Sequence, residues 1–193
     1  MILASRNPHK LREFGEIEGL DGIEPLPEGI VLPPEDAPDF AGNAMGKARA
    51  AHEATGLEAI ADDSGLVVDG LGGQPGVRSA RYAGPDATDS ENLDRLIREV
   101  TPLPPEGRAA RYVCALAHVD SDGTEQVVEG VCEGVVIAEP RGDGGFGYDP
   151  VFIPADTGEF DLRTMAELDP AEKHAISHRG RAARLLVERL SGG

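Results

Sequence analysis

The segment RYVCALAHVDSDGTEQVVEGVCEGVVIA, Arg111 to Ala138, decides the fold class of this chain. Arg111–Val119 and Glu125–Ala138 are long, apolar and rich in β-branched residues, and the Asp120-Ser121-Asp122-Gly123 stretch between them is typical of a turn. We therefore predict a β-hairpin over these residues. Because helix-like and strand-like segments alternate through the rest of the chain, this hairpin predicts an α/β fold with a mixed sheet flanked by helices.

Capping residues predict where the helices around this hairpin begin and end. Asn7 and Pro8 suit the N-cap and the first turn of a helix, and Asp169-Pro170 repeats that pattern near the C-terminus. Thr88 and Glu91 have the spacing of a capping box, ahead of an amphipathic stretch. A further Ala-rich helix is expected over Asn43–Thr55, and Gly56 after it suits a C-terminal cap.

The charge of the chain excludes several classes of partner. Its 193 residues include 35 acidic and 18 basic side chains, which gives a formal net charge of −17. A single domain with two lobes, spanning residues 1–193, is the expected organisation at this length. Such an acidic surface should repel nucleic acid and anionic membranes, and it should also repel a free nucleotide. With no apolar run near the ~20 residues needed to span a bilayer and no secretory signal, a cytoplasmic protein is expected.

The cysteines and histidines do not predict a metal site. Cys114 and Cys132 lie in apolar strand-like segments, and buried thiols without a disulfide are expected for a cytoplasmic chain. The histidines at positions 9, 52, 118 and 174 show no spacing typical of zinc ligands.

The first candidate site is the segment from Ser5 to Lys10, where a short apolar strand turns into a capped helix. The first turn of a helix presents unpaired N–H groups and the positive end of the helix dipole, which suits a phosphate group. Lys10 falls in that turn and would add a full positive charge. The segment lacks the P-loop pattern, so an ordinary capped helix with a solvated lysine is the alternative.

The second candidate site is Asp62-Asp63-Ser64-Gly65, which lies between two predicted strands, Glu58–Ala61 and Leu66–Asp69. Open α/β sheets bind ligands at the carboxyl ends of their strands. Magnesium typically takes one or two carboxylates together with substrate phosphates, and a second carboxylate can deprotonate a water molecule. Taken alone, the segment is more typical of a simple turn between two strands.

Two further segments are candidates for ligand contact. Between Gly142 and Asp149 a glycine-rich loop carries Phe146 and Tyr148, and an aromatic face can stack on a nucleobase. The alternative is a glycine-rich hairpin end. Lys173 and the run Ile176–Gly180 gather cationic and titratable groups in an otherwise acidic chain, although a junction between two helices with surface arginines would explain them as well.

Taken together, these segments resemble the inosine triphosphate pyrophosphatase family, also called XTP/dITP diphosphatases. The resemblance runs from residue 1 to about residue 190 and rests on five motifs in the family's order. They are Ser5-x-Asn7-x-x-Lys10, Ala61-Asp62-Asp63-Ser64-Gly65-Leu66, Ser79-Ala80-Arg81-Tyr82-Ala83-Gly84, Gly144-Gly145-Phe146-Gly147-Tyr148-Asp149-Pro150, and Glu172-Lys173 with Ser177-His178-Arg179-Gly180.

The resemblance implies an elongated α/β fold with two lobes around a nucleotide cleft, usually in a homodimer. It also implies Mg²⁺-dependent hydrolysis of ITP, dITP and XTP between the α- and β-phosphates, which gives the monophosphate and pyrophosphate. Asp63 would be the general base, and Asp63 and the adjacent Asp62 would be the metal ligands. The residues that would contact the substrate are Ser5, Arg6, Asn7, Pro8, His9, Lys10, Ser64, Phe146, Gly147, Tyr148, Asp149, Lys173, His178 and Arg179.

One position departs from the family pattern. Family members commonly have Phe-x-Glu-Asn-Ala ahead of the Ala-rich helix, and that glutamate is a metal ligand in some of them. Here the segment is Phe40-Ala41-Gly42-Asn43-Ala44. We therefore expect weaker metal binding, unless Glu35, Asp36 or Asp39 reaches in from the preceding loop.

Three other functions are compatible with parts of this pattern. A related pyrophosphatase could act on other bases, such as modified pyrimidines. A nucleotide-binding regulator that has lost catalysis would explain Gly42. An acidic structural partner protein would explain the charge, but it would leave the five ordered motifs unexplained.

Overall fold

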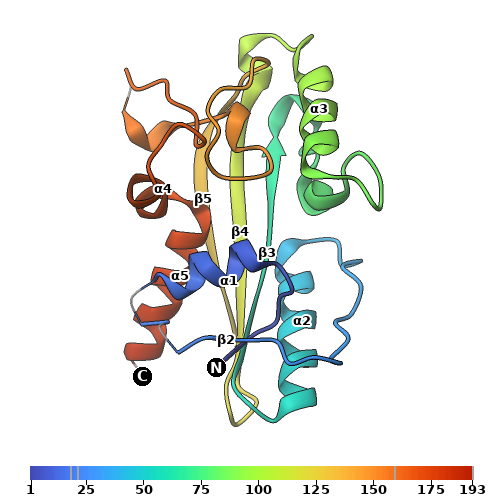
Figure 1. The fold of residues 1–193 in the computed structure, drawn as a ribbon, viewed down its shortest axis with the longest axis vertical. Helices are drawn as coiled ribbons and strands as arrows, with labels where there is room; N and C mark the ends of the chain where they lie inside the picture. The colour runs from blue at the N-terminus through green and yellow to red at the C-terminus, as the bar shows by residue number, and fades with distance from the viewer. Residues whose placement is uncertain (18, 21, 159, 193) are drawn as a thin grey trace. The chain divides into compact units, whose positions relative to one another are not determined.

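The computed structural model describes residues 1–17, 19–20, 22–158 and 160–192. One six-stranded sheet has the strand order β2-β1-β3-β4-β5-β6. Its strands are β1 (Ile2–Leu3), β2 (Glu24–Pro25), β3 (Ala59–Val68), β4 (Ala109–Val119), β5 (Glu125–Val136) and β6 (Phe152–Pro154). The helices are α1 (Pro8–Gly15), α2 (Phe40–Thr55), α3 (Asp89–Val100), α4 (Pro170–Ile176) and α5 (His178–Ser191), joined by short 3₁₀ segments (Figure 1).

The predicted mixed α/β fold is confirmed. Strand β1 pairs in parallel with both β2 and β3, whereas β5 and β6 pair antiparallel. Strands β4 and β5 form the predicted hairpin, and the turn between them is closed by a hydrogen bond from the Gly123 N–H to the Asp120 carbonyl. Both cysteines are buried and neither forms a disulfide. Among the described residues, no helix is long and apolar enough to cross a membrane.

The predicted helix caps are also present. Asn7 accepts a hydrogen bond from the His9 N–H at the start of α1, and both Thr88 and Asp169 form capping boxes with the glutamate three residues later. Helix α2 begins earlier than predicted, because Asp39 caps it by accepting from the Gly42 N–H. Gly56 ends α2 in the left-handed conformation that glycine adopts without steric cost.

The chain divides into two compact units. Unit 1 comprises Met1–Ser64, Cys114–Gly130 and His178–Gly193, and unit 2 comprises Gly65–Val113 and Val131–Ser177. In unit 1, α2 packs on one face of the sheet through small side chains such as Ala48 and Ala61. Helices α1 and α5 pack on the other face, where Phe14 and Leu186 meet Ile60 (Figure 1).

In unit 2 a single core forms beneath α3. Leu96 and Val100 of α3 are fully buried together with Leu66 of β3. The rings of Tyr112 and Phe152 pack against each other with their centroids 4.7 Å apart. This core supports the glycine-rich loop that precedes β6.

One predicted boundary is wrong. The residues Asp62-Asp63-Ser64-Gly65 do not form a turn between two strands, because β3 runs without interruption from Ala59 to Val68. Polar residues followed by glycine usually mark a turn. Here both carboxylates are buried inside the strand, and neighbouring side chains described below compensate their charge.

Gly130 of β5 allows α5 to approach the sheet. A Cβ atom there would lie 2.2 Å from the His178 carbonyl oxygen and 2.4 Å from the Ala182 nitrogen. We expect Gly130→Ala to lower the free energy of unfolding by about 1–3 kcal/mol, since overpacking forces the backbone to shift. The matched control is Gly46→Ala in α2, where the new Cβ would approach only Pro33, at 3.8 Å. The control should raise the free energy of unfolding by about 0.5–1 kcal/mol in urea titrations, because alanine favours a helix interior. Equal changes in both variants would contradict this prediction.

Candidate active site

The alternation of side chains along β3 separates the two adjacent aspartates. Successive residues of a strand point to opposite faces of the sheet. Ile60 packs with α1 and α5, whereas Ala61 packs with α2. Asp62 accordingly meets residues of α1 and α5, and Asp63 meets residues of α2. The two carboxylates therefore have different contact partners, and the charges of Lys10 and Lys47 act on both of them.

Asp62 is fully buried and is paired with two cations of unit 1. The Lys10 Nζ atom lies 2.9 Å from Oδ1, and the Arg179 Nε atom donates to Oδ2 at 3.3 Å. The Ser64 hydroxyl donates to the same Oδ2 atom at 2.9 Å. Burial alone would raise the pKa of Asp62, but the charges of Lys10 and Arg179 outweigh it and hold that pKa well below its ordinary value. These contacts favour an ion-pairing role for Asp62 over the metal-ligand role expected from its position beside Asp63.

Asp63 has a weaker set of partners on the opposite face. Its Oδ2 atom accepts a hydrogen bond from the Asn43 amide at 2.9 Å, and the Lys47 Nζ atom lies 3.8 Å from Oδ1. Burial raises the pKa of Asp63 above its ordinary value, and the charge of Lys47 and the Asn43 hydrogen bond only partly oppose this shift. Asp63 thus has the environment expected of a general base, since a raised pKa makes a carboxylate a better proton acceptor.

Lys47 and Asn43 are site residues that the sequence analysis did not identify. They are four positions apart in α2, so they lie on the same face of the helix. The available signal was the scarcity of lysine, because Lys47 is one of only three lysines in the chain. Like Lys10, it is paired with a carboxylate of the candidate site.

The pattern of oxygen ligands on the α2 face fits magnesium. Within the described part of the chain, no group of three or more His, Cys, Asp or Glu side chains is placed to hold a metal ion. Two carboxylates nevertheless share one ammonium, because the Lys47 Nζ atom lies 2.5 Å from Glu35 and 3.8 Å from Asp63. One or two carboxylates completed by substrate phosphates and water are the usual magnesium environment.

Neighbouring side chains leave little space for a longer residue at Gly42, the position where the family commonly has glutamate. A Cβ atom on Gly42 would lie 2.8 Å from the Ala37 Cβ atom and 3.1 Å from Asp39. A longer side chain there would first have to displace the loop that leads from Glu35 into α2. Asp39 is itself occupied as the cap of α2, and Asp36 is exposed. Glu35 is the loop residue placed to replace the missing glutamate, because Lys47 is paired with both Glu35 and Asp63.

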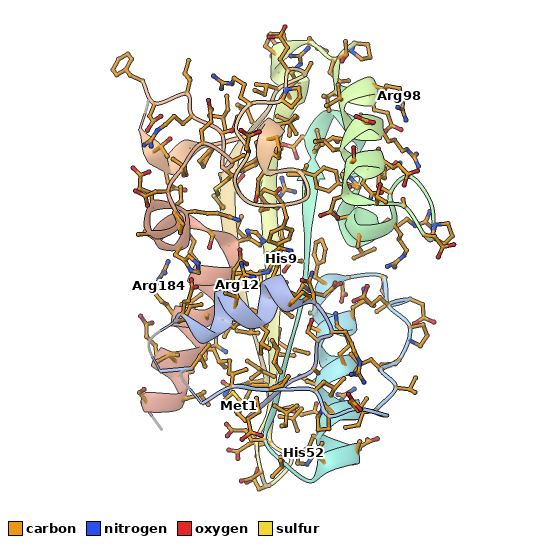
Figure 2. All side chains as sticks on the ribbon, in the orientation of Figure 1. Met1, His9, Arg12, His52, Arg98 and Arg184 are labelled. Carbon is orange, nitrogen blue, oxygen red and sulfur yellow. The ribbon has the colours of Figure 1, made fainter. Side chains whose placement is uncertain are left out.

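The segment Ser5–Lys10 forms the predicted strand-to-helix turn. The Ser5 hydroxyl oxygen accepts a hydrogen bond from the Asn7 N–H at 3.1 Å, and Pro8 is the first residue of α1. His9 is exposed on α1, as is Arg12 one turn later (Figure 2). The Arg6 guanidinium instead donates to the carbonyls of Pro27 and Ile30, so it fastens the following loop.

In unit 2 the glycine-rich loop is organised around the buried carboxylate of Asp149. Its Oδ2 atom accepts from the Phe146 N–H and from the Lys173 ammonium, both at 2.9 Å, and its Oδ1 atom accepts from the Tyr112 hydroxyl at 3.2 Å. The Lys173 Nζ atom also lies 5.0 Å from the centre of the Phe146 ring. Gly145 must be glycine here, because φ is +71° and a Cβ would lie 2.1 Å from Asp149.

Other contacts in unit 2 fix the far end of this loop. The Tyr148 hydroxyl donates to the Ser79 carbonyl at 2.7 Å, and the Gly147 N–H donates to Asp89 at 3.2 Å. Ser79 in turn accepts a hydrogen bond from the Leu66 N–H. The Ser79–Gly84 motif therefore supports the glycine-rich loop, a role that its sequence alone did not reveal.

The C-terminal motif is divided between the two units. Lys173 belongs to unit 2, whereas His178 and Arg179 begin α5 in unit 1, where both are buried. The structure therefore brings together Lys10, Asp62, Ser64 and Arg179 in unit 1, and Phe146, Asp149 and Lys173 in unit 2.

Comparisons with known proteins identify the family of this chain. The model of the Ham1 family matches residues 1–189. A dITP/XTP pyrophosphatase of Mycolicibacterium paratuberculosis is 48% identical over 197 aligned residues, which cover 98% of this chain and 95% of the relative. One from Shigella flexneri is 45% identical and covers 100% of this chain and 98% of its own length. Among solved structures, a HAM1 protein from Coxiella burnetii has a TM-score of 0.87 at 40% identity, covering 100% of this chain and 98% of that one.

The raised pKa of Asp63 predicts how stability depends on pH. A carboxyl whose pKa is higher in the folded state than its unfolded value of 3.8 destabilises the fold at neutral pH, and this cost disappears once pH falls below the unfolded value. We therefore expect Asp63→Asn to be more stable than wild type at pH 7 in EDTA. The new asparagine can still accept the hydrogen bond from Asn43, and Lys47 remains paired with Glu35. Urea titrations should show that the gain shrinks as pH falls toward 3.8. A variant less stable than wild type at pH 7 would contradict the assigned shift.

Proposed function

We propose that this chain, which belongs to the Ham1 family, hydrolyses the deaminated purine nucleotides ITP, dITP and XTP to the monophosphate and pyrophosphate. The observation that carries the proposal is that the adjacent aspartates of β3 have different contacts and therefore different roles. Asp62 holds two cations that can bind phosphate, and Asp63 on the other face has the raised pKa of a proton acceptor. The names of the relatives, which cover nearly the whole chain, support the same substrates.

In the proposed reaction Asp63 removes a proton from a water molecule as the water oxygen attacks the α-phosphorus. The bond between that phosphorus and the oxygen bridging to the β-phosphate breaks, and pyrophosphate leaves with the bonding electrons. Asn43 orients the carboxylate through its hydrogen bond to Oδ2. Lys10 and Arg179 stabilise the negative charge that spreads over the phosphate oxygens.

Magnesium is the proposed cofactor, and Asp63 and Glu35 would hold it together with phosphate oxygens of the substrate. When bound, it would neutralise phosphate charge and so favour attack on phosphorus. The Lys47 ammonium is paired with both carboxylates.

We propose that the residues assigned to the substrate by the resemblance contact the nucleotide. They are Ser5, Arg6, Asn7, Pro8, His9, Lys10, Ser64, Phe146, Gly147, Tyr148, Asp149, Lys173, His178 and Arg179. Inosine and xanthosine present an O6 acceptor where adenine presents an amino group, so protein donors aimed at that position would reject adenine. The Phe146 ring, held by the Asp149 contacts, is a surface on which a base can stack.

The proposal extends to the cell and the assembly. A homodimer in the cytoplasm fits the family resemblance and the task of clearing a nucleotide pool. The net charge of −17 argues against nucleic acid or an anionic membrane surface as a partner.

A substrate panel with pyrophosphate detection tests the proposed reaction. With Mg²⁺, we expect turnover of ITP, dITP and XTP to exceed that of GTP and dTTP by about 100-fold. Guanine shares the O6 acceptor, so its 2-amino group must be excluded separately, by shape or by leaving a donor unpaired. Asp63→Asn should bind ITP yet lose about 100-fold or more in kcat, the contribution typical of general-base catalysis. A preference for dTTP would indicate a pyrimidine nucleotide pyrophosphatase. Tight binding of ITP without product would indicate a regulator instead.

The proposed role of Glu35 predicts a change in the magnesium requirement. We expect Glu35→Gln to raise the Mg²⁺ concentration for half-maximal turnover by about 10-fold or more, the loss typical when a carboxylate of a metal site is removed. Asp36→Asn is the matched control, because Asp36 is the adjacent acidic residue of the same loop but is exposed. Equal magnesium requirements in the two variants would remove Glu35 from the metal site.

A further inference from the structure

Asp62 lies inside a chain of four alternating charges in unit 1. Lys10 contacts its Oδ1 atom at 2.9 Å and Arg179 contacts its Oδ2 atom at 3.3 Å. The other end of the Arg179 guanidinium lies 3.1 Å from Glu13, which is on α1 one turn after Lys10. The order of charges is therefore Lys10, Asp62, Arg179, Glu13, and it ties β3 to both α1 and α5.

Burial sets Asp62 apart from the other members of this chain. Its side chain is 0% exposed, whereas Lys10 and Glu13 keep 15% and 18% of their side-chain surface exposed. A buried charge persists only where it is paired and hydrogen-bonded. Asp62 is paired with Lys10 at Oδ1, and its Oδ2 atom accepts hydrogen bonds from Arg179 and from the Ser64 hydroxyl.

We propose that Asp62 is a positioning residue whose carboxylate fixes the Lys10 ammonium and the Arg179 guanidinium where they bind the phosphate chain of the substrate. This inference rests on the proposed function, in which those two cations contact phosphate. In this role Asp62 acts through the two cations, because Lys10 is paired with its Oδ1 atom and Arg179 with its Oδ2 atom.

The net charge of these four side chains distinguishes a positioning role for Asp62 from simple attraction of phosphate. Two cations and two carboxylates sum to zero, so the four groups do not attract phosphate through net charge. Replacing Asp62 by a neutral side chain leaves an excess of one positive charge and frees Lys10 to move. An anion should then bind at least as well as before, while the alignment needed for reaction is lost. A displacement of about 1 Å can reduce turnover by about 100-fold.

The test compares Asp62→Asn with Glu13→Gln, which removes the same charge from the outer end of the chain. In EDTA, inorganic pyrophosphate should raise the unfolding temperature of Asp62→Asn by roughly 3 °C more than that of wild type, because the anion replaces the missing buried charge.

With Mg²⁺ and ITP, kcat should fall by about 100-fold in Asp62→Asn while KM changes less than about threefold. In Glu13→Gln, kcat should stay within about threefold of wild type, because Asp62 still holds both cations.

A second variant covers the possibility that Asp62→Asn does not fold. Asp62→Glu keeps the charge but moves the carboxylate by one methylene group, so kcat should fall about 10-fold or more in a folded protein. Wild-type kcat in either folded Asp62 variant would overturn the proposal, as would equal losses of kcat in Asp62→Asn and Glu13→Gln. Failure of the wild type to release pyrophosphate from any nucleotide would instead overturn the proposed function.

Discussion

The pairing of the buried Asp62 carboxylate with Lys10 and Arg179 is the constraint on which the rest of unit 1 depends. A carboxylate without exposed surface in the middle of a strand would be strongly destabilising if it were unpaired. Its two cations come from different helices, so α1 and α5 must both pack on the same face of β3. Gly130 contributes to this arrangement by leaving room for the first turn of α5, which carries Arg179. The ion pairs therefore connect sheet packing directly to the placement of the cations proposed to bind phosphate.

Unit 2 uses the same physical device with different residues. Asp149 is buried and gathers one cation, one hydroxyl and one backbone N–H, from Lys173, Tyr112 and Phe146. In both units a buried aspartate thus fixes groups that can contact a ligand, and the chemistry is left to the neighbours. Asp63 fits this division, because burial with few compensating contacts raises its pKa and suits it to proton transfer.

Much of this fold could be predicted from the sequence because its signals are local. The caps at Asn7, Thr88 and Asp169 and the hairpin turn depend on neighbouring residues alone. The path of β3 through Asp62–Gly65 could not be predicted in the same way. Two aspartates, a serine and a glycine favour a turn locally. The cations that make a buried strand possible there, Lys10, Lys47 and Arg179, all come from distant helices. Lys47 was missed for a related reason, since its partners lie in a loop and in another strand.

The net charge of −17 at first argues against a phosphate ligand, and the arrangement of the lysines resolves this conflict. Physiological salt screens exposed charges beyond about 8 Å, so distant surface carboxylates contribute little to the potential at a binding site. The local balance is set by the groups in contact, and each of the three lysines is paired with an aspartate of the candidate site, Lys10 with Asp62, Lys47 with Asp63 and Lys173 with Asp149. A lysine paired in this way adds little net positive charge, but its ammonium is held at a fixed position where it can contact a phosphate oxygen. An acidic protein can therefore bind a triphosphate selectively, because only a ligand that matches those positions recovers the cost of approaching a negative surface.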